Sequence, residues 1–131
     1  MLGSESVKHY KELKVWQRGM VLVKDIYRLT DGFPASEKYG LAAQLRRAAV
    51  SVPSNIAEGQ ARSGTKEFLQ FLSHASGSLA EMETQVLLSM DLGYCEPPHT
   101  AAIMQEIVEL QKMLAAIRRK LRAHLPPATH H

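Results

Sequence analysis

The sequence predicts an all-α protein, an antiparallel up-down-up-down four-helix bundle with a proline-kinked second helix. Four long segments repeat apolar residues in alternating steps of four and three, the spacing that lines one face of a helix. Short polar or proline-containing breaks join these segments, and none of them alternates apolar and polar residues as a strand does. The length of 131 residues suits one domain, which we place at residues 1–131.

The first predicted helix covers residues 14–30 and carries two apolar lines. We assign the core stripe to Trp16, Met20, Val23 and Tyr27. A second line beside it consists of Val15, Leu22, Ile26 and Leu29. This second line is either the edge of a broad core stripe or a surface that packs against neighbouring subunits, and Met104 and Val108 leave the same alternatives open on the fourth helix.

The second predicted helix covers residues 36–62, with Ser36 as its N-cap, and it contains Pro53. Its stripe consists of Leu41, Leu45, Ala48, Val52 and Ile56. A proline inside a helix removes one backbone hydrogen bond and costs about 3 kcal/mol. Because the stripe keeps its phase across Pro53, we expect a kinked but continuous helix.

A polar ridge lies opposite this stripe. At 100° per residue it consists of Arg47, Ser51, Ser54, Glu58 and Arg62. It is either a solvated face beside a structural kink or a shaped surface for a partner or a second subunit. The candidate residues for this interface or structural ridge are Ser51, Pro53, Ser54, Asn55 and Glu58.

The third predicted helix covers residues 65–92 and the fourth covers residues 99–125. Thr65 is a candidate cap for the third, whose stripe consists of Phe68, Leu72, Ala75, Leu79, Met82 and Val86. The stripe of the fourth consists of Ile103, Ile107, Leu110, Leu114, Ile117 and Leu121. We expect Gly93 and Pro97-Pro98 to form the connection and Pro126-Pro127 to end the fourth helix. His130 and His131 resemble the remnant of a tag.

Patterns for catalysis or metal binding are weak. A carboxylate-bridged metal pair in a bundle needs two Glu-x-x-His sequences and two further glutamates, whereas this chain has one, from Glu96 to His99, in a proline-rich connection. Cys95 has only His99 nearby as a base, so an ordinary buried or half-buried thiol is the simpler interpretation. The sequence therefore predicts no enzyme, no metal and no cofactor.

Composition indicates a cytoplasmic protein with no membrane segment. No apolar run approaches the roughly 20 residues that a membrane span requires. Cys95 is the one cysteine, and the N-terminus does not resemble an export signal.

The net charge of +3 is unevenly distributed along the chain. Residues 63–96 carry one basic and five acidic side chains, while the other segments are basic. Such asymmetry indicates either a nucleic-acid-binding face or complementary faces in self-assembly.

Clustered lysines and arginines are the candidate nucleic-acid-binding residues. They are Arg46, Arg47, Arg62, Lys66, Arg118, Arg119, Lys120 and Arg122. Such clusters neutralise phosphates without reading bases, although basic residues near the end of the last helix also suit its dipole. Trp16, Tyr27 and Phe68 fall on predicted core stripes, so we expect no aromatic platform for stacking single-stranded bases.

Two long stretches carry a family resemblance. They read LKVWQRGMVLVKDIYRLTDGFPASEKYGLAAQLRRAAVSVPSNIAEG and EFLQFLSHASGSLAEMETQVLLSMDLGY. Over residues 12–122 the chain closely resembles the four-helix-bundle proteins called 23S-rRNA intervening-sequence proteins. The most specific parts of this resemblance are QLRRAAVSVPSNIAEG and GSLAEMET. Members are named for reading frames inside insertions in bacterial 23S rRNA genes.

The resemblance implies an antiparallel four-helix bundle that assembles as a ring-like homopentamer. A bundle of similar fold and fivefold assembly, the accessory protein of diversity-generating retroelements, binds nucleic acid and a reverse transcriptase through basic surface. We therefore expect a homo-oligomer that binds RNA or DNA as an accessory to a nucleoprotein complex. The alternative is a protein-interaction scaffold with a protein partner and no nucleic-acid role.

Overall fold

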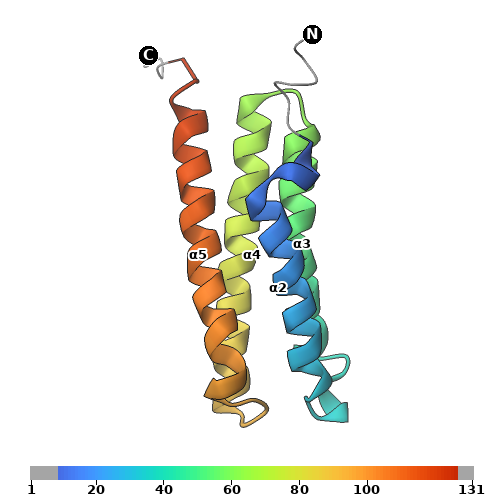
Figure 1. Ribbon diagram of the computed structural model, residues 1–131. Helices are drawn as coiled ribbons and strands as arrows, with labels where there is room; N and C mark the ends of the chain where they lie inside the picture. The colour runs from blue at the N-terminus through green and yellow to red at the C-terminus, as the bar shows by residue number, and fades with distance from the viewer. Residues whose placement is uncertain (1–8, 127–131) are drawn as a thin grey trace, which may run out of the picture.

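The computed structural model describes residues 9–126, which form an all-helical bundle (Figure 1). Its four long helices are α2 (Lys14–Asp31), α3 (Leu41–Ala61), α4 (Thr65–Asp91) and α5 (Pro97–Arg122). Two short 3-10 helices, η1 (Tyr10–Glu12) and η2 (Ala35–Glu37), precede α2 and α3. No strand occurs between residues 9 and 126, so the predicted all-α fold with four helices is confirmed. His130, His131 and Pro127 lie outside the described residues.

Consecutive helices lie side by side and run in opposite directions in Figure 1. Cross-helix hydrogen bonds give the register of α3 against α4. Gln85 Nε2 donates to Gln44 Oε1 at 3.4 Å, and the hydroxyls of Ser51 and Ser78 lie 2.8 Å apart. From Gln44 to Ser51 the residue numbers on α3 rise, while those of their partners on α4 fall from Gln85 to Ser78. This pair of helices is therefore antiparallel.

The contact between α2 and α5 closes the bundle. Arg18 donates from Nη2 and Nε to the two carboxylate oxygens of Glu106, at 2.6 and 2.7 Å. Its third nitrogen, Nη1, lies 3.5 Å from the sulfur of Met113, also on α5. A bidentate guanidinium–carboxylate pair fixes both distance and orientation, so it sets the register of α5 on α2.

The predicted stripes of α3, α4 and α5 form most of the core. On α3 all five stripe residues are buried, and on α4 the stripe is buried from Leu72 to Val86 while Phe68 is half-buried. On α5 the stripe is buried from Ile103 to Leu114 and half-buried at Ile117 and Leu121.

The predicted core stripe of α2 is wrong. Met20 is 38% exposed and Tyr27 is 42% exposed, while Trp16 and Val23 are only partly buried. The second apolar line faces the core instead: Leu22 and Ile26 are 1% and 0% exposed. Both lines have helical spacing, and the buried line lies on the same side of α2 as Gly19, which faces Val52 and Pro53 of α3.

The second helix begins at Leu41 rather than at residue 36. Ser36 is therefore not its N-cap; it lies in η2, and Gly40, with φ −106° and ψ −116°, separates η2 from α3. The cap comes from Glu37, whose Oε1 accepts a hydrogen bond from the backbone N–H of Leu41 at 2.9 Å. A carboxylate here satisfies one of the N–H groups that the first turn leaves unpaired.

The other helix ends differ from prediction by one to three residues. α2 includes Asp31, α4 ends at Asp91, and Gly64 rather than Thr65 is the N-cap position of α4. Pro97 and Pro98 form the first turn of α5 instead of a connection, because a proline at the first helical position loses no intrahelical hydrogen bond. α5 ends at Arg122, before the proline pair that we expected to terminate it.

α3 is continuous across Pro53, as predicted. Pro53 is buried, and a Cβ built on Gly19 would lie 3.7 Å from the Pro53 ring. The proline therefore packs against α2, where its ring contributes apolar surface. The bend at Pro53 stays a prediction.

Glu37 makes the start of α3 sensitive to pH. The pKa of Glu37 lies below its ordinary value of 4.5 because the carboxylate accepts hydrogen bonds from the Leu41 N–H and from the Tyr94 hydroxyl, the latter at 2.8 Å. A carboxyl group whose pKa is lower in the folded protein than in the unfolded chain stabilises the fold at pH values above its unfolded pKa. This contribution disappears as the pH falls through its folded pKa. Protonation below about pH 4.5 should therefore weaken this end of the bundle.

We expect Glu37→Gln to lower the melting temperature at pH 7, and this difference should shrink as the pH falls below about 4.5. The variant keeps an oxygen acceptor for Leu41 but cannot ionise. Thermal unfolding of both proteins at several pH values measures the difference, and a difference that stays constant from pH 7 to 3 would contradict this role for the charge.

Candidate functional site

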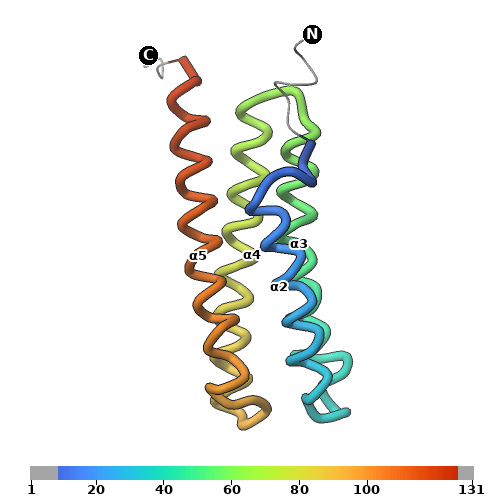
Figure 2. Tube along the Cα trace, viewed as in Figure 1, coloured from blue at the N-terminus to red at the C-terminus, as the bar shows by residue number. Residues whose placement is uncertain are grey.

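One end of the bundle is rich in basic side chains from two distant segments. α3 ends there and α4 begins there, and α5 ends there as well (Figures 1 and 2). This basic end consists of six predicted candidates: Arg62, Lys66, Arg118, Arg119, Lys120 and Arg122. The fold thus places at one end residues that the sequence separates by more than fifty positions.

Most cations of the basic end have no protein partner. Lys66, Arg119, Lys120 and Arg122 are exposed, and within residues 9–126 none of them forms an ion pair or a side-chain hydrogen bond. The half-buried Arg118 differs, because its Nε is buried without a hydrogen-bond partner in the described part of the chain. The charges at the end of α5 also face the negative pole of its dipole, which stabilises the helix.

Arg62 is held by its neighbours on both helices. Its Nη2 donates to Glu58 Oε2 at 2.8 Å, and its guanidinium lies over the ring of Phe71, 5.1 Å from the centroid. Glu58 and Arg62, four residues apart, therefore form an ion pair at the end of α3. Half-exposed pairs of this kind contribute little to stability, and the charge of Arg62 is partly neutralised.

Arg46 and Arg47 do not belong to the basic end. They lie near the beginning of α3, towards the other end of the bundle. Arg46 is bonded to the end of α2, donating from Nε to Thr30 Oγ1 at 2.7 Å and from Nη2 to Asp31 Oδ1 at 2.8 Å. Arg47 is exposed and has no ion pair within residues 9–126. The eight predicted phosphate contacts thus form two separate groups.

The predicted polar ridge of α3 divides over several surfaces. Ser51 and Asn55 face α4: Asn55 Nδ2 donates to Ser51 Oγ at 2.8 Å, and Ser51 in turn bonds to Ser78. Pro53 faces α2 and is buried. Ser54 and Glu58 are exposed. Pro53 and the Ser51–Asn55 pair therefore have structural contacts, and only Ser54 and Glu58 remain open to a partner.

A polar cleft of about 430 Å³ lies between α3 and α4, beside this serine pair. Gln44, Arg47, Ser51, Ser78 and Glu81 line it. Gln85 borders it, donating to Glu81 Oε2 at 3.2 Å, and the Oε1 atom of Gln85 is buried without a partner in the described chain. No sequence pattern indicates this cleft, because it depends on the register between two helices.

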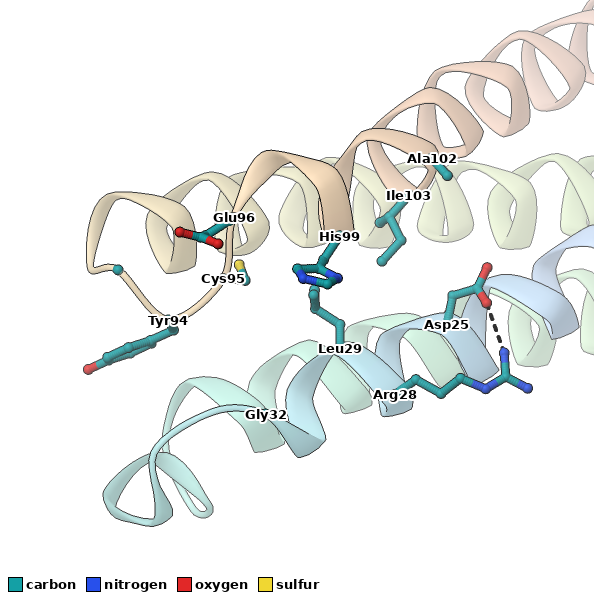
Figure 3. A pocket seen from close by; sticks show the side chains of 11 residues that line it. Asp25, Arg28, Leu29, Gly32, Tyr94, Cys95, Glu96, His99, Ala102 and Ile103 are labelled. Atoms are coloured by element: carbon teal, nitrogen blue, oxygen red, sulfur yellow. Dashed lines mark hydrogen bonds and ion pairs between the residues drawn. The ribbon is translucent and has the colours of Figure 1, made fainter.

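A cavity of about 660 Å³ lies at the other end of the bundle (Figure 3). Asp25, Arg28 and Leu29 of α2 lie on one side, and Cys95, Glu96 and His99 lie on the other. Burial raises the pKa of the Cys95 thiol, which disfavours the nucleophilic thiolate. Within residues 9–126 no group of three or more His, Cys, Asp or Glu side chains has a geometry that would hold a metal ion.

A second groove of about 660 Å³ lies on the outer face of α2 and α3, and we call it the α2–α3 groove. It is lined by Tyr27, Lys38, Tyr39, Ala43, Arg46, Arg47, Val50 and Ser51. The expectation that Tyr27 is a core residue is wrong, since its ring borders this groove. Tyr39 precedes α3 in a short connection and is 87% exposed, and no helical pattern could have indicated it.

None of the helices between residues 9 and 126 is long and apolar enough to span a membrane. The fold and the basic end define the class of protein as a small four-helix bundle with an exposed cationic end.

Comparison with known proteins gives the family. The model of the 23S rRNA-intervening sequence protein family matches residues 11–116, and the chain belongs to this family. A solved structure with the same fold is a protein of unknown function from the S23 ribosomal protein family of Bacteroides thetaiotaomicron. It is 21% identical, with a TM-score of 0.74, and the match covers 80% of this chain and 95% of that one. No curated protein matches.

Proposed function

We propose that this protein is a non-enzymatic homo-oligomeric bundle that binds RNA or DNA through its basic end, as an accessory to a nucleoprotein complex. The observation that carries the proposal is the set of unpaired cations at one end of the bundle. Lys66, Arg119, Lys120 and Arg122 are exposed and make no ion pair within residues 9–126. Their charges are available to an external anion.

Phosphate groups are the anions that such a surface suits best. Each phosphate that a lysine or arginine neutralises releases a condensed counterion, so binding gains free energy at low salt without any contact to a base. No acidic side chain occurs from residue 110 to residue 126, so the end of α5 presents cations alone. Binding through this surface is electrostatic and directed by backbone shape.

The family resemblance also supports the proposal that this protein binds nucleic acid. The family resembles in fold the retroelement accessory protein, a nucleic-acid-binding bundle of fivefold assembly, whereas the family name records only the location of the reading frames. In a homopentamer, the assembly that the resemblance implies, five basic ends contribute to binding together. Several weak phosphate contacts then act as one multivalent surface.

We expect the double variant Arg119→Ala/Lys120→Ala to weaken binding to a structured RNA at about 50 mM salt by roughly tenfold or more. It should also reduce the slope of log affinity against log salt by about 1–2, because each lost phosphate contact removes about 0.7–0.9 from that slope. Fluorescence anisotropy over a salt series measures both quantities.

The matched control is Lys24→Ala/Lys112→Ala, which removes the same charge from exposed positions away from the basic end. If both double variants lose affinity equally, net charge rather than the basic end governs binding. Wild-type protein that binds neither RNA nor DNA at about 50 mM salt, or whose affinity does not depend on salt, would overturn the proposal.

The second candidate function is a protein-interaction scaffold. Three large apolar side chains at the end of α4, Leu87, Leu88 and the C-cap residue Leu92, are each about half exposed beside the acidic residues of that helix. An acidic and apolar face suits the basic face of another subunit or of a partner protein. Light scattering that gives a multiple of the 14.6 kDa chain mass, without any nucleic-acid binding, would favour this function.

A further inference from the structure

The α2–α3 groove combines cations with exposed aromatic rings. Of its eight lining residues, three are basic, Lys38, Arg46 and Arg47, and none is acidic. Two are tyrosines, which line it from α2 and from the connection before α3. A groove of this composition complements a ligand that carries both negative charge and flat apolar faces.

Tyr39 is the most exposed large apolar side chain in the described chain, at 87%. Its ring has no aromatic neighbour among residues 9–126, and its hydroxyl forms no hydrogen bond there. Its one recorded ring contact is with Lys38, whose Nζ lies 5.5 Å from the ring centroid. Because the ring contributes so little to the core, its face is free to stack on a ligand.

Tyr27 and Arg46 form a second flat surface in the same groove. The guanidinium carbon of Arg46 lies 4.6 Å from the Tyr27 centroid, so cation and ring are stacked. Hydrogen bonds to Thr30 and Asp31 hold the guanidinium in this position. The planar group is therefore preorganised and loses little freedom when a base stacks on it.

We propose that the α2–α3 groove binds single-stranded nucleic acid, with an unpaired base stacked on Tyr39 and phosphates neutralised by Lys38 and Arg47. This inference rests on the proposed function and adds a second surface, one that prefers unpaired strands. Stacking on aromatic rings requires bases that are not already paired, so duplexes cannot use Tyr39. RNA and DNA strands share the required chemistry, because both carry phosphates and bases with exposed π faces.

The experiment compares two variants of one residue. Tyr39→Ala removes the ring, whereas Tyr39→Phe keeps the ring and removes only a hydroxyl that has no hydrogen bond in the described chain. Anisotropy with labelled single strands of about 12 nucleotides, oligo(U) and oligo(dT), and with a duplex of similar length gives the affinities.

We expect Tyr39→Ala to weaken single-strand binding by about 5- to 150-fold, the effect of losing one stacked base, while duplex binding changes less than twofold. Tyr39→Phe should bind like the wild type.

Arg47→Ala should weaken binding to both oligo(U) and oligo(dT) and reduce its salt dependence. Lys112→Ala, which removes an exposed cation of α5, serves as the charge-matched control. Equal effects on oligo(U) and oligo(dT) indicate no sugar preference, and a larger loss for oligo(U) indicates an RNA ligand.

Three results would overturn the inference. If Tyr39→Ala binds single strands as tightly as Tyr39→Phe, the groove is not the site, although the basic end can still carry the proposed function. If wild-type protein binds no nucleic acid at about 50 mM salt, the proposed function fails as well. If Tyr39→Ala instead lowers the mass measured by light scattering, the groove is a contact between copies of this chain.

Discussion

Leu22→Ala should lower the free energy of unfolding by about 2–5 kcal/mol. Leu22 is 1% exposed and lies on the line of α2 that faces the core. Removing its terminal carbons leaves a cavity that the surrounding close-packed side chains fill only in part. Urea unfolding followed by circular dichroism at fixed protein concentration measures the change, because the stability of the proposed oligomer would depend on that concentration.

Met20→Ala is the matched control on the same helix. Met20 belongs to the other apolar line and is 38% exposed, so its truncation should cost less than about 1 kcal/mol. If Met20→Ala were as destabilising as Leu22→Ala, the outer line would be buried in the native assembly. A loss of mass by light scattering in the Met20 variant would then place that line between subunits.

Gly59→Ala should destabilise the protein by about 1–2 kcal/mol, although alanine favours helices over glycine by about 1 kcal/mol. A Cβ at position 59 would lie 2.8 Å from Phe71 Cβ and 2.9 Å from Phe68 Cδ1. The Phe71 Cβ is fixed close to the backbone of α4, so α3 and α4 would have to separate. Thermal or urea unfolding measures the loss.

Gly77→Ala provides a control of opposite sign. Gly77 is an exposed residue of α4, and a Cβ there would meet nothing within 4 Å. The helix propensity of alanine then acts alone and should stabilise the protein by about 0.5–1 kcal/mol. Equal effects of the two substitutions would mean that α3 and α4 are not in close contact at Gly59.

The sequence predicts the helices of this bundle well because their apolar spacing is regular. The stripe of α4 is buried from Leu72 to Val86. On α2 the same reasoning fails, because two neighbouring lines share one spacing and hydropathy does not decide which faces inward.

The candidate site is less predictable, because it depends on contacts between elements. Arg46 and Arg47 are adjacent in the sequence, yet Arg46 is bonded to Thr30 and Asp31 while Arg47 is unpaired in the described chain. A sequence pattern gives the charge of a residue and its side of a helix, but not its partner on the next helix. Tyr39 lies in a connection without periodicity, so its exposure follows only from the folded chain.

The pair of Arg18 and Glu106 has a consequence for the order in which the chain folds. These residues are 88 positions apart, whereas α2, α3, α4 and α5 are otherwise joined to their neighbours by short connections. Contacts between consecutive helices require closure of small loops and form early, while the seam between α2 and α5 requires almost the whole chain. We expect the first and last helices to dock last, with this ion pair selecting the register in which the bundle closes.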